Sequence, residues 1–155
     1  MIICAGINVQ AKEFEGLREN FSVLQVASAT EAVELLNKAE VVLIGPNALH
    51  PAKEVQKIFA ADKHISIIIL ALPAKAKQIK QTIQISPFIG KNTLVVILVP
   101  ELDLVTICAN AVGRTRQKRK FSALIIKHED VAAHKEKVKL AQMGTFWSMP
   151  LLQQF

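Results

Sequence analysis

The sequence predicts an α/β protein with a five-stranded parallel sheet covered by helices on both faces. Over residues 1–113, five short runs rich in β-branched residues alternate with longer segments whose apolar residues recur every three or four positions. This alternation is typical of βα units, which build parallel sheets. Runs that are apolar at every position are expected where a strand is buried on both of its faces.

Five segments are predicted to be strands. The third, residues 40–45, is apolar from Val41 onward, and the fourth, residues 65–72, is rich in isoleucine and leucine. Strands this short, joined by short loops and helices, fit a flavodoxin-like (βα)5 three-layer sandwich with strand order 2-1-3-4-5. The predicted strands cover residues 2–5, 21–27, 40–45, 65–72 and 93–99.

Helix signals follow each predicted strand. Apolar residues recur at helical spacing from Phe14, and Ser28 stands three residues before Glu31, which is the spacing of a capping box. Pro51 and Pro73 are each placed to open a helix, because proline fits the first helical position. The predicted helices cover residues 9–20 and 28–39, a segment from Pro51 through Phe59, and residues 73–85 and 101–112.

The basic excess of the chain lies at its C-terminal end. The 155 residues include 19 Lys and Arg against 13 Asp and Glu, a formal net charge of +6. Residues 1–113 carry ten basic and ten acidic residues, whereas residues 114–155 carry nine basic and three acidic residues. We therefore predict a globular domain over residues 1–113 and a basic helical extension over residues 114–155.

Composition excludes several classes of protein. With 51% apolar residues, the chain is too hydrophobic to be disordered. No apolar run approaches the ~20 residues that span a bilayer, and the first ten residues do not resemble a secretory signal. Cys4 and Cys108 are too few for a disulfide framework, so we expect small core residues in a reduced, cytoplasmic protein.

The segments expected beyond the carboxyl ends of the strands carry almost no reactive side chains. Ligands of open α/β sheets bind at this edge. Asn8 and Asn47 are the only polar side chains there, so a divalent cation would find no carboxylate. No glycine-rich phosphate loop is present either, and acid, base and nucleophile are all missing. We predict no catalytic residue, no metal site and no cofactor.

Three stretches carry a family pattern: VLQVASATEAVELLNKAEVVLIGPNAL (23–49), SIIILALPAKAKQI (66–79) and VVILVPELDLVTICANAV (95–112). Through them, residues 1–120 resemble the receiver domain of two-component response regulators. The resemblance implies a phosphorylation site with two acidic residues after the first strand and a phosphoacceptor Asp after the third. A Ser or Thr follows the fourth strand, and a Lys precedes a Pro after the fifth. The corresponding residues here are Gly6 and Ile7, Gly45, Ala71, and Val99 before Pro100.

None of these residues can perform the role that the resemblance assigns to its position, because none accepts a phosphoryl group or binds its metal. The chain is therefore interpreted as a degenerate receiver, or pseudo-receiver, of a phosphorelay pathway, acting by contact with protein partners. The resemblance also implies a cis peptide bond before Pro100. The expected interaction surface comprises the fourth helix, fifth strand and fifth helix together with the extension: Lys75, Lys77, Lys80, Leu102, Val105, Phe121, Leu124, Val131 and Val138.

The extension is expected to be a long helix that continues from the fifth helix. Phe121, Leu124, Val131 and Val138 lie on a heptad-like seam, which either pairs two subunits in a dimer or packs on the chain's own domain. KVKLAQMGTFWSM (137–149) resembles the entry into a PAS sensory domain, which Gly144, Phe146 and Trp147 would begin. On that interpretation the chain is a fragment of a larger signalling protein.

Two other functions stay open. The RTRQKRK cluster at residues 114–120 could bind nucleic acid or an anionic membrane through its charge, although no aromatic residues for base stacking are interleaved with it. A small α/β enzyme with an unrecognised site is the least favoured, since the sheet edge lacks reactive groups. His128 and His134 stand six residues apart and do not share a helix face at metal-binding spacing.

Overall fold

The computed structural model describes residues 1–84 and 91–143, and of residues 126–143 it describes the backbone alone. Its sheet has five strands, all parallel, in the order β2-β1-β3-β4-β5. This is a flavodoxin-like α/β fold, and the predicted strand order is confirmed. The strands are β1 (Ile2–Ala5), β2 (Val23–Val26), β3 (Val41–Ile44), β4 (Ser66–Ala71) and β5 (Thr93–Ile97).

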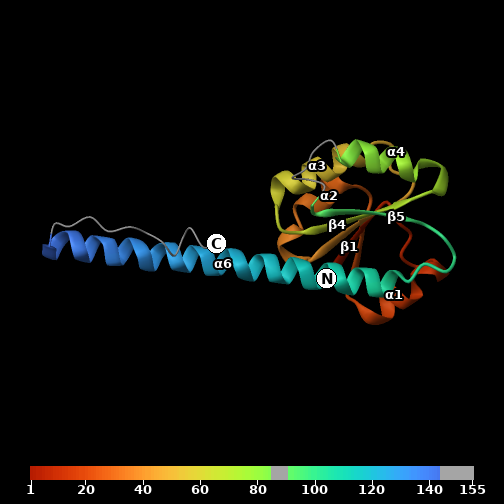
Figure 1. Ribbon diagram of the computed structural model, residues 1–155. Helices are drawn as coiled ribbons and strands as arrows, with labels where there is room; N and C mark the ends of the chain where they lie inside the picture. Colours follow the sequence, from red (N-terminus) through yellow and green to blue (C-terminus); the bar gives the residue numbers. More distant parts are fainter. Residues whose placement is uncertain (85–90, 144–155) are drawn as a thin grey trace. The chain divides into compact units, whose positions relative to one another are not determined.

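Helices cover both faces of this sheet (Figure 1). Side chains of α2, α3 and α4 build the apolar cluster on one face, and α1 and the first part of α6 build the cluster on the other. Pro51 and Pro73 each stand at the first position of their helix, as predicted. The helices are α1 (Glu15–Asn20), α2 (Ala29–Val33), α3 (Pro51–Ala61), α4 (Pro73–Gln84) and α6 (Leu104–Met143).

The central strands supply both halves of the core. Along β1, Ile3 and Ala5 join the cluster beneath α2, α3 and α4, while Ile2 and Cys4 join the cluster beneath α1 and α6. Every residue of β1, β3 and β4 is buried, which accounts for sequences that are apolar at every position except Ser66. Full burial of one large aliphatic side chain contributes about 1.5–3 kcal/mol, so these strands dominate the stability of the domain.

The first predicted helix is shorter than expected. Residues 9–11 form a loop, a 3-10 turn covers Lys12–Phe14, and only then does α1 begin. The side chain of Arg18 holds this loop by donating to the carbonyl of Val9 and, at 2.9 Å, to that of Ala11. Gln25 on β2 accepts a hydrogen bond from the Val9 amide at 3.1 Å. These bonds satisfy three backbone groups of the loop, and two of them, the Val9 and Ala11 carbonyls, would have been paired internally in a helix.

The second predicted helix is divided. Helix α2 ends at Val33, and a 3-10 turn over Leu36–Lys38 leads into β3. The predicted capping box is not formed, because the Ser28 side chain makes no capping hydrogen bond. Glu31 nevertheless reaches back, and its carboxylate accepts a hydrogen bond from the Ala27 amide at 3.0 Å.

Helix α6 continues from the domain into the extension, which confirms the predicted long helix. The chain divides into two compact units, Met1–Arg116 and Gln117–Phe155, close to the boundary that the charge distribution indicates. Within the described residues, no helix is both long and apolar enough to cross a membrane. The side chains of Val131 and Val138, and the predicted PAS entry at residues 144–147, lie outside the described residues.

The start of α6 is capped by the residue before it. Asp103 accepts hydrogen bonds from the Thr106 amide at 3.2 Å and from the Thr106 hydroxyl at 2.6 Å. Both bonds hold the pKa of the Asp103 carboxyl below its ordinary value, and the bond from the Thr106 hydroxyl has the larger effect. The peptide bond before Pro100 is trans, so the expected cis bond is wrong. Trans is the preferred isomer even before proline.

Candidate functional site

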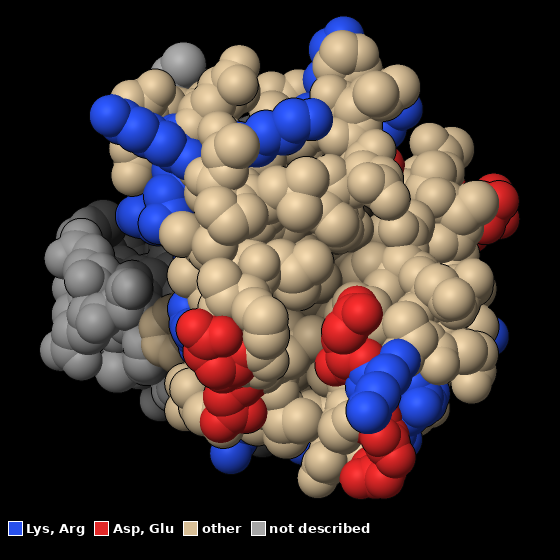
Figure 2. Space-filling model, turned by 90° about the vertical axis from the view of Figure 1, so that its right-hand side faces the viewer, with Lys and Arg blue, Asp and Glu red and all other residues tan. Residues whose placement is uncertain are grey.

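The segments that follow β1, β3, β4 and β5 meet at the carboxyl edge of the sheet. Figure 2 looks onto this edge, where a broad area of uncharged residues lies between basic side chains at the top, near α4, and a mixed group of acidic and basic side chains at the bottom. The edge includes the five positions that the receiver resemblance assigns to a phosphorylation site: Gly6, Ile7, Gly45, Ala71 and Val99.

Gly6 and Gly45 bring the ends of β1 and β3 into direct contact. Gly6 adopts φ = +67°, a conformation that favours glycine, and its amide donates to the Val26 carbonyl at 3.0 Å. A Cβ atom placed on Gly45 would stand 2.5 Å from the Gly6 carbonyl oxygen and 3.0 Å from Cγ1 of Ile7. Position 45 therefore accommodates only glycine as the backbone stands, and an aspartate there would require β1 or β3 to move.

Apolar side chains fill the space beside this contact. Ile7 is 5% exposed and Val9 is 7% exposed, and both belong to the cluster beneath α1 and α6. The receiver resemblance assigns an acidic residue to position 7, where this chain has a buried aliphatic side chain. The loop that carries both residues is fixed by Arg18 and Gln25. The closed edge is thus supported by packing and by hydrogen bonds.

The other two positions are equally unreactive. Ala71 is 1% exposed at the end of β4, and its carbonyl accepts a hydrogen bond from the Leu98 amide at 2.9 Å. Val99 is half-buried, and its carbonyl accepts from Leu102 at 3.1 Å in a turn. No group of three or more His, Cys, Asp or Glu that could hold a metal ion occurs among the described residues.

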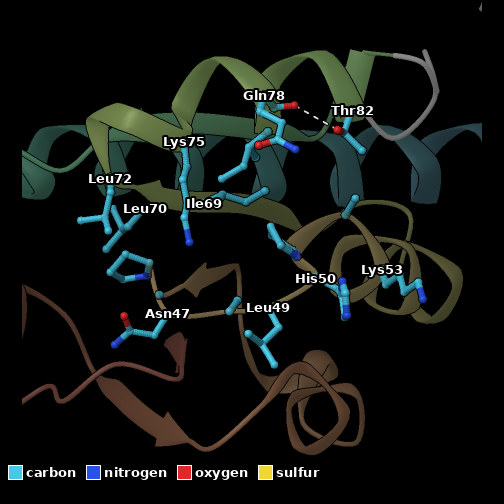
Figure 3. A pocket seen from close by; sticks show the side chains of 16 residues that line it. Asn47, Leu49, His50, Lys53, Ile69, Leu70, Leu72, Lys75, Gln78 and Thr82 are labelled. Carbon is cyan, nitrogen blue, oxygen red and sulfur yellow. Dashed lines mark hydrogen bonds between the residues drawn. The ribbon is translucent and has the colours of Figure 1, made fainter.

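A pocket of about 520 Å³ opens beside this closed edge, between the β3–α3 loop and α4. Sequence reasoning did not predict it, because its walls come from separate segments. Its lining combines apolar residues such as Pro46, Ile69 and Ile79 with polar residues of α4. In Figure 3, Lys75 and Gln78 point from α4 toward the β3–α3 loop, whereas His50 and Lys53 point away from α4.

Helix α4 and strand β5 form a second surface, which we call the α4–β5 face. Lys75, Lys77 and Lys80 are all exposed on α4, and the helix carries no acidic residue. Strand β5 is an edge strand, and its Leu94 and Ile97 are each 39% exposed. Sequence reasoning placed the three lysines here but missed both apolar residues. Their position on the last strand of a 2-1-3-4-5 sheet was the available signal.

The predicted interaction residues in α6 and just before it differ in their surroundings. Leu102 and Val105 are partly buried, and Leu102 packs against the cluster beneath α1 and α6. A Cβ placed on Gly16 of α1 would stand 3.2 Å from Val105 Cγ2, so this valine faces α1. Phe121 and Leu124, in the second unit, are 45% and 44% exposed. The structure thus places Lys75, Lys77 and Lys80 on one surface and Val105 in a helix contact.

Comparison of the chain with protein-family models, with curated proteins and with solved structures finds no match. The resemblance to receivers therefore rests on the residues quoted above. The flavodoxin-like fold itself hosts many unrelated functions, so a function must be argued from the surfaces just described.

Both cysteines are buried in the cluster beneath α1 and α6, as predicted, and both are free thiols. Burial raises the pKa of the Cys4 thiol to about 12, and the nearby Cys108 adds to the effect. Burial likewise raises the pKa of Cys108 to about 12. A buried thiol with a raised pKa is rarely a thiolate near neutral pH, which disfavours a nucleophilic role for these cysteines.

A buried polar cluster lies at the amino end of the sheet, where sequence reasoning expected nothing. Thr115 of α6 is fully buried, and its hydroxyl oxygen lies 2.6 Å from the Glu40 carbonyl, 3.0 Å from the Ser66 amide and 2.8 Å from the Ser66 hydroxyl. The Ser66 hydroxyl also donates to the Ala111 carbonyl at 3.1 Å. Every polar group of this cluster has a partner, as expected of a structural element.

Proposed function

We propose that this chain is a regulatory module of signal transduction that acts by contact with a protein partner, without phosphorylation and without catalysis. It would be a receiver-like domain whose phosphorylation site has been lost. The observation that carries the proposal is the contact between Gly45 and Gly6, because it closes the position of the phosphoacceptor as well as leaving it without a carboxylate.

The closed carboxyl edge supports a role that does not involve phosphoryl transfer. Transfer of a phosphoryl group to a protein needs an acceptor, a metal and groups that stabilise the developing charge. Gly45 and Ile7 stand where the acceptor and a metal ligand would be, and Ile7 is buried among apolar side chains. The domain still offers exposed surfaces such as the α4–β5 face, and we propose that it acts by binding a protein partner through them.

The α4–β5 face supports a partner of stated chemistry: a protein segment that combines acidic and apolar side chains. Lys77 and Lys80 on α4 supply positive charge to this face, and Leu94 and Ile97 on β5 supply exposed apolar area. Two copies of this face would bring lysines against lysines, so charge disfavours its use in a homodimer. A homodimer, if one forms, would use α6 of the extension.

The basic cluster at residues 114–120 does not carry a second proposal. Thr115 is fully buried, and Arg116 forms an ion pair with Glu40 at 3.3 Å. Part of the cluster therefore belongs to the folding of the domain.

The direct test is incubation of the full chain with acetyl phosphate and Mg²⁺, followed by intact-mass measurement. We expect no phosphoryl group on the native chain. We also expect none on Gly45→Asp, which supplies a carboxylate but must place it against the Gly6 carbonyl. Circular dichroism reports whether the variant folds. A phosphoryl group on the native chain that hydroxylamine removes would be an acyl phosphate, and would overturn the proposal.

The partner chemistry is tested by titrating the ¹⁵N-labelled chain with a peptide that alternates glutamate and leucine. We expect amide shifts in α4 and β5, and weaker binding by the Lys77→Glu, Lys80→Glu double variant. The matched control is the same peptide with glutamine in place of glutamate, which keeps the length and the apolar residues. Equal binding of the two peptides would show that charge complementarity plays no part, and would refute this choice of partner.

A further inference from the structure

The pocket between the β3–α3 loop and α4 lies where open α/β sheets bind ligands. Its lining includes Gly45 and Pro46 beyond β3 and Leu70 near the end of β4, so it borders the carboxyl edge. Its volume of about 520 Å³ falls within the range of about 300–1,000 Å³ for small-molecule sites. The closed contact between Gly6 and Gly45 leaves this space intact, because it lies on the side of β3 that faces β4 and α4.

The pocket combines an apolar surface with two exposed polar side chains on its α4 wall. Buried Ile69 and half-buried Ile79 and Pro46 supply apolar lining. Lys75 and Gln78 point from α4 into the space above the β3–α3 loop (Figure 3). In the part of the chain that the structure describes, neither side chain forms an intramolecular hydrogen bond or ion pair. A few such polar groups over an apolar surface are the usual composition of a ligand site.

The charge of the pocket selects the ligand. Its charged lining residues are Lys53 and Lys75, and none of its lining residues is acidic. Only Lys75 points across the opening, since Lys53 points away from α4 (Figure 3). One ammonium group with an adjacent carboxamide suits a single carboxylate or phosphate, to which both groups can donate hydrogen bonds.

We propose that this pocket binds a small molecule with an apolar body and one anionic group. Lys75 and Gln78 would bind the anionic group, and the surface around Ile69 and Ile79 would contact the apolar body. The proposal goes beyond the regulatory function above, because it assigns the domain a chemical input in place of phosphorylation. It also gives the two neighbouring lysines of α4 different roles: Lys75 binds the ligand, and Lys77 belongs to the α4–β5 face.

The test is titration of the ¹⁵N-labelled full chain with octanoate, with octan-1-ol as the neutral molecule of the same chain length. We expect saturable amide shifts in residues 45–53 and at the start of α4. Octanoate should bind about fivefold more tightly than octanol, the size of a solvent-accessible ion pair. Lys75→Gln should remove that difference by weakening octanoate alone.

Two kinds of variant keep the test decisive. Lys77→Gln is the matched control, since it removes the same charge from the same helix but does not line the pocket, and octanoate affinity should stay within about twofold of the native value. Ala48→Phe and, from the opposite wall, Thr82→Phe fill the pocket and should abolish the shifts. If circular dichroism shows that one of these two variants does not fold, the other still tests whether a filled pocket abolishes binding.

Three results would overturn the proposal: no saturable shift among the lining residues, equal binding of octanoate and octanol, or equal loss in Lys75→Gln and Lys77→Gln. The outcome is independent of the phosphorylation test. A chain that binds octanoate and also forms an acyl phosphate refutes the regulatory proposal alone. A chain that does neither refutes the pocket proposal alone.

Discussion

The two ends of the sheet are closed by different means. At the carboxyl end, the backbones of Gly6 and Gly45 meet, and Ile7 packs beside them. At the amino end, hydrogen bonds through Thr115 and Ser66 connect α6 to the starts of β3 and β4. In open α/β folds, the carboxyl end holds the functional polar groups. Here the buried polar cluster lies at the amino end.

The position of this cluster indicates that buried polar groups serve structure at the amino end of the sheet. A buried hydroxyl whose neighbours are all satisfied fixes one arrangement of the elements that it joins. Thr115 is the last buried residue of α6 before the domain ends at Arg116, so it anchors the helix at the point where the extension begins. At the carboxyl end, in contrast, the contact between β1 and β3 depends on the absence of a Cβ atom at Gly45, and Arg18 and Gln25 hold the adjoining loop by hydrogen bonds.

The largest expected effect breaks the carboxyl end. Gly45→Ala places a methyl group 2.5 Å from the Gly6 carbonyl oxygen, a backbone atom that cannot rotate away. We expect a loss of about 3 kcal/mol in the free energy of unfolding, at the upper end for overpacked cores. Chemical denaturation of the native chain and of Gly45→Ala measures the difference in their free energies of unfolding.

Gly113→Ala is the matched control for that variant. Gly113 lies within α6, and a Cβ there would meet nothing within 4 Å. Alanine in a helix interior should therefore raise the free energy of unfolding by up to about 1 kcal/mol. If Gly45→Ala proved as harmless as this control, the two strand ends would have room to separate, and the carboxyl end would not be closed.

The next effect breaks the amino end. Thr115→Val keeps the shape of the side chain but removes the hydroxyl that bridges Glu40 and Ser66. We expect a loss of about 2 kcal/mol in the free energy of unfolding, because buried polar groups lose their partner. Thr115→Ser keeps the hydroxyl and should lose about 1 kcal/mol through its missing methyl group. Serine and valine variants of equal stability would show that the hydrogen bonds contribute little.

The contrast between these ends explains how far sequence reasoning could reach. The strand segments and the starts of α3 and α4 were predictable, because they follow from apolar runs and from Pro51 and Pro73. The strand order then followed from the predicted fold class. Thr115 was assigned to the extension because it stands inside the basic cluster at residues 114–120. Its spacing was the missed signal: seven residues after Cys108, it continues the buried stripe of α6 through Ala111 and Val112.

The closed carboxyl edge could be predicted only in part. The absence of reactive residues at Gly45 and Ile7 is visible in the sequence. The contact of Gly45 with Gly6 is not, because it depends on how closely β1 and β3 approach beyond their last paired residues. The pocket escaped prediction for a similar reason, since Pro46 and Ile79 meet across it from segments more than thirty residues apart.

The smallest effect sharpens the comparison through pH. The Glu40 carboxylate is 17% exposed and contacts the amino group of Met1 and the guanidinium of Arg116. Burial favours the neutral acid, but these two partners outweigh it and hold the pKa of Glu40 below its ordinary 4.5. The unfolded chain therefore binds the proton more readily, so this contribution to stability is complete above about pH 4.5 and is lost as the pH falls through the lowered folded-state pKa.

Glu40→Gln should reduce the acid sensitivity of unfolding while leaving the hydrogen bonds of Thr115 in place, because those bonds use the Glu40 carbonyl of the main chain. Urea unfolding midpoints measured on both sides of pH 4.5 give the comparison, and Glu19→Gln, on an exposed side chain of α1, is the control. If Glu40→Gln and Glu19→Gln changed the pH profile equally, the carboxylate would be no more than a surface charge. The amino end would then depend on Thr115 and Ser66 alone, which the Thr115→Val variant measures separately.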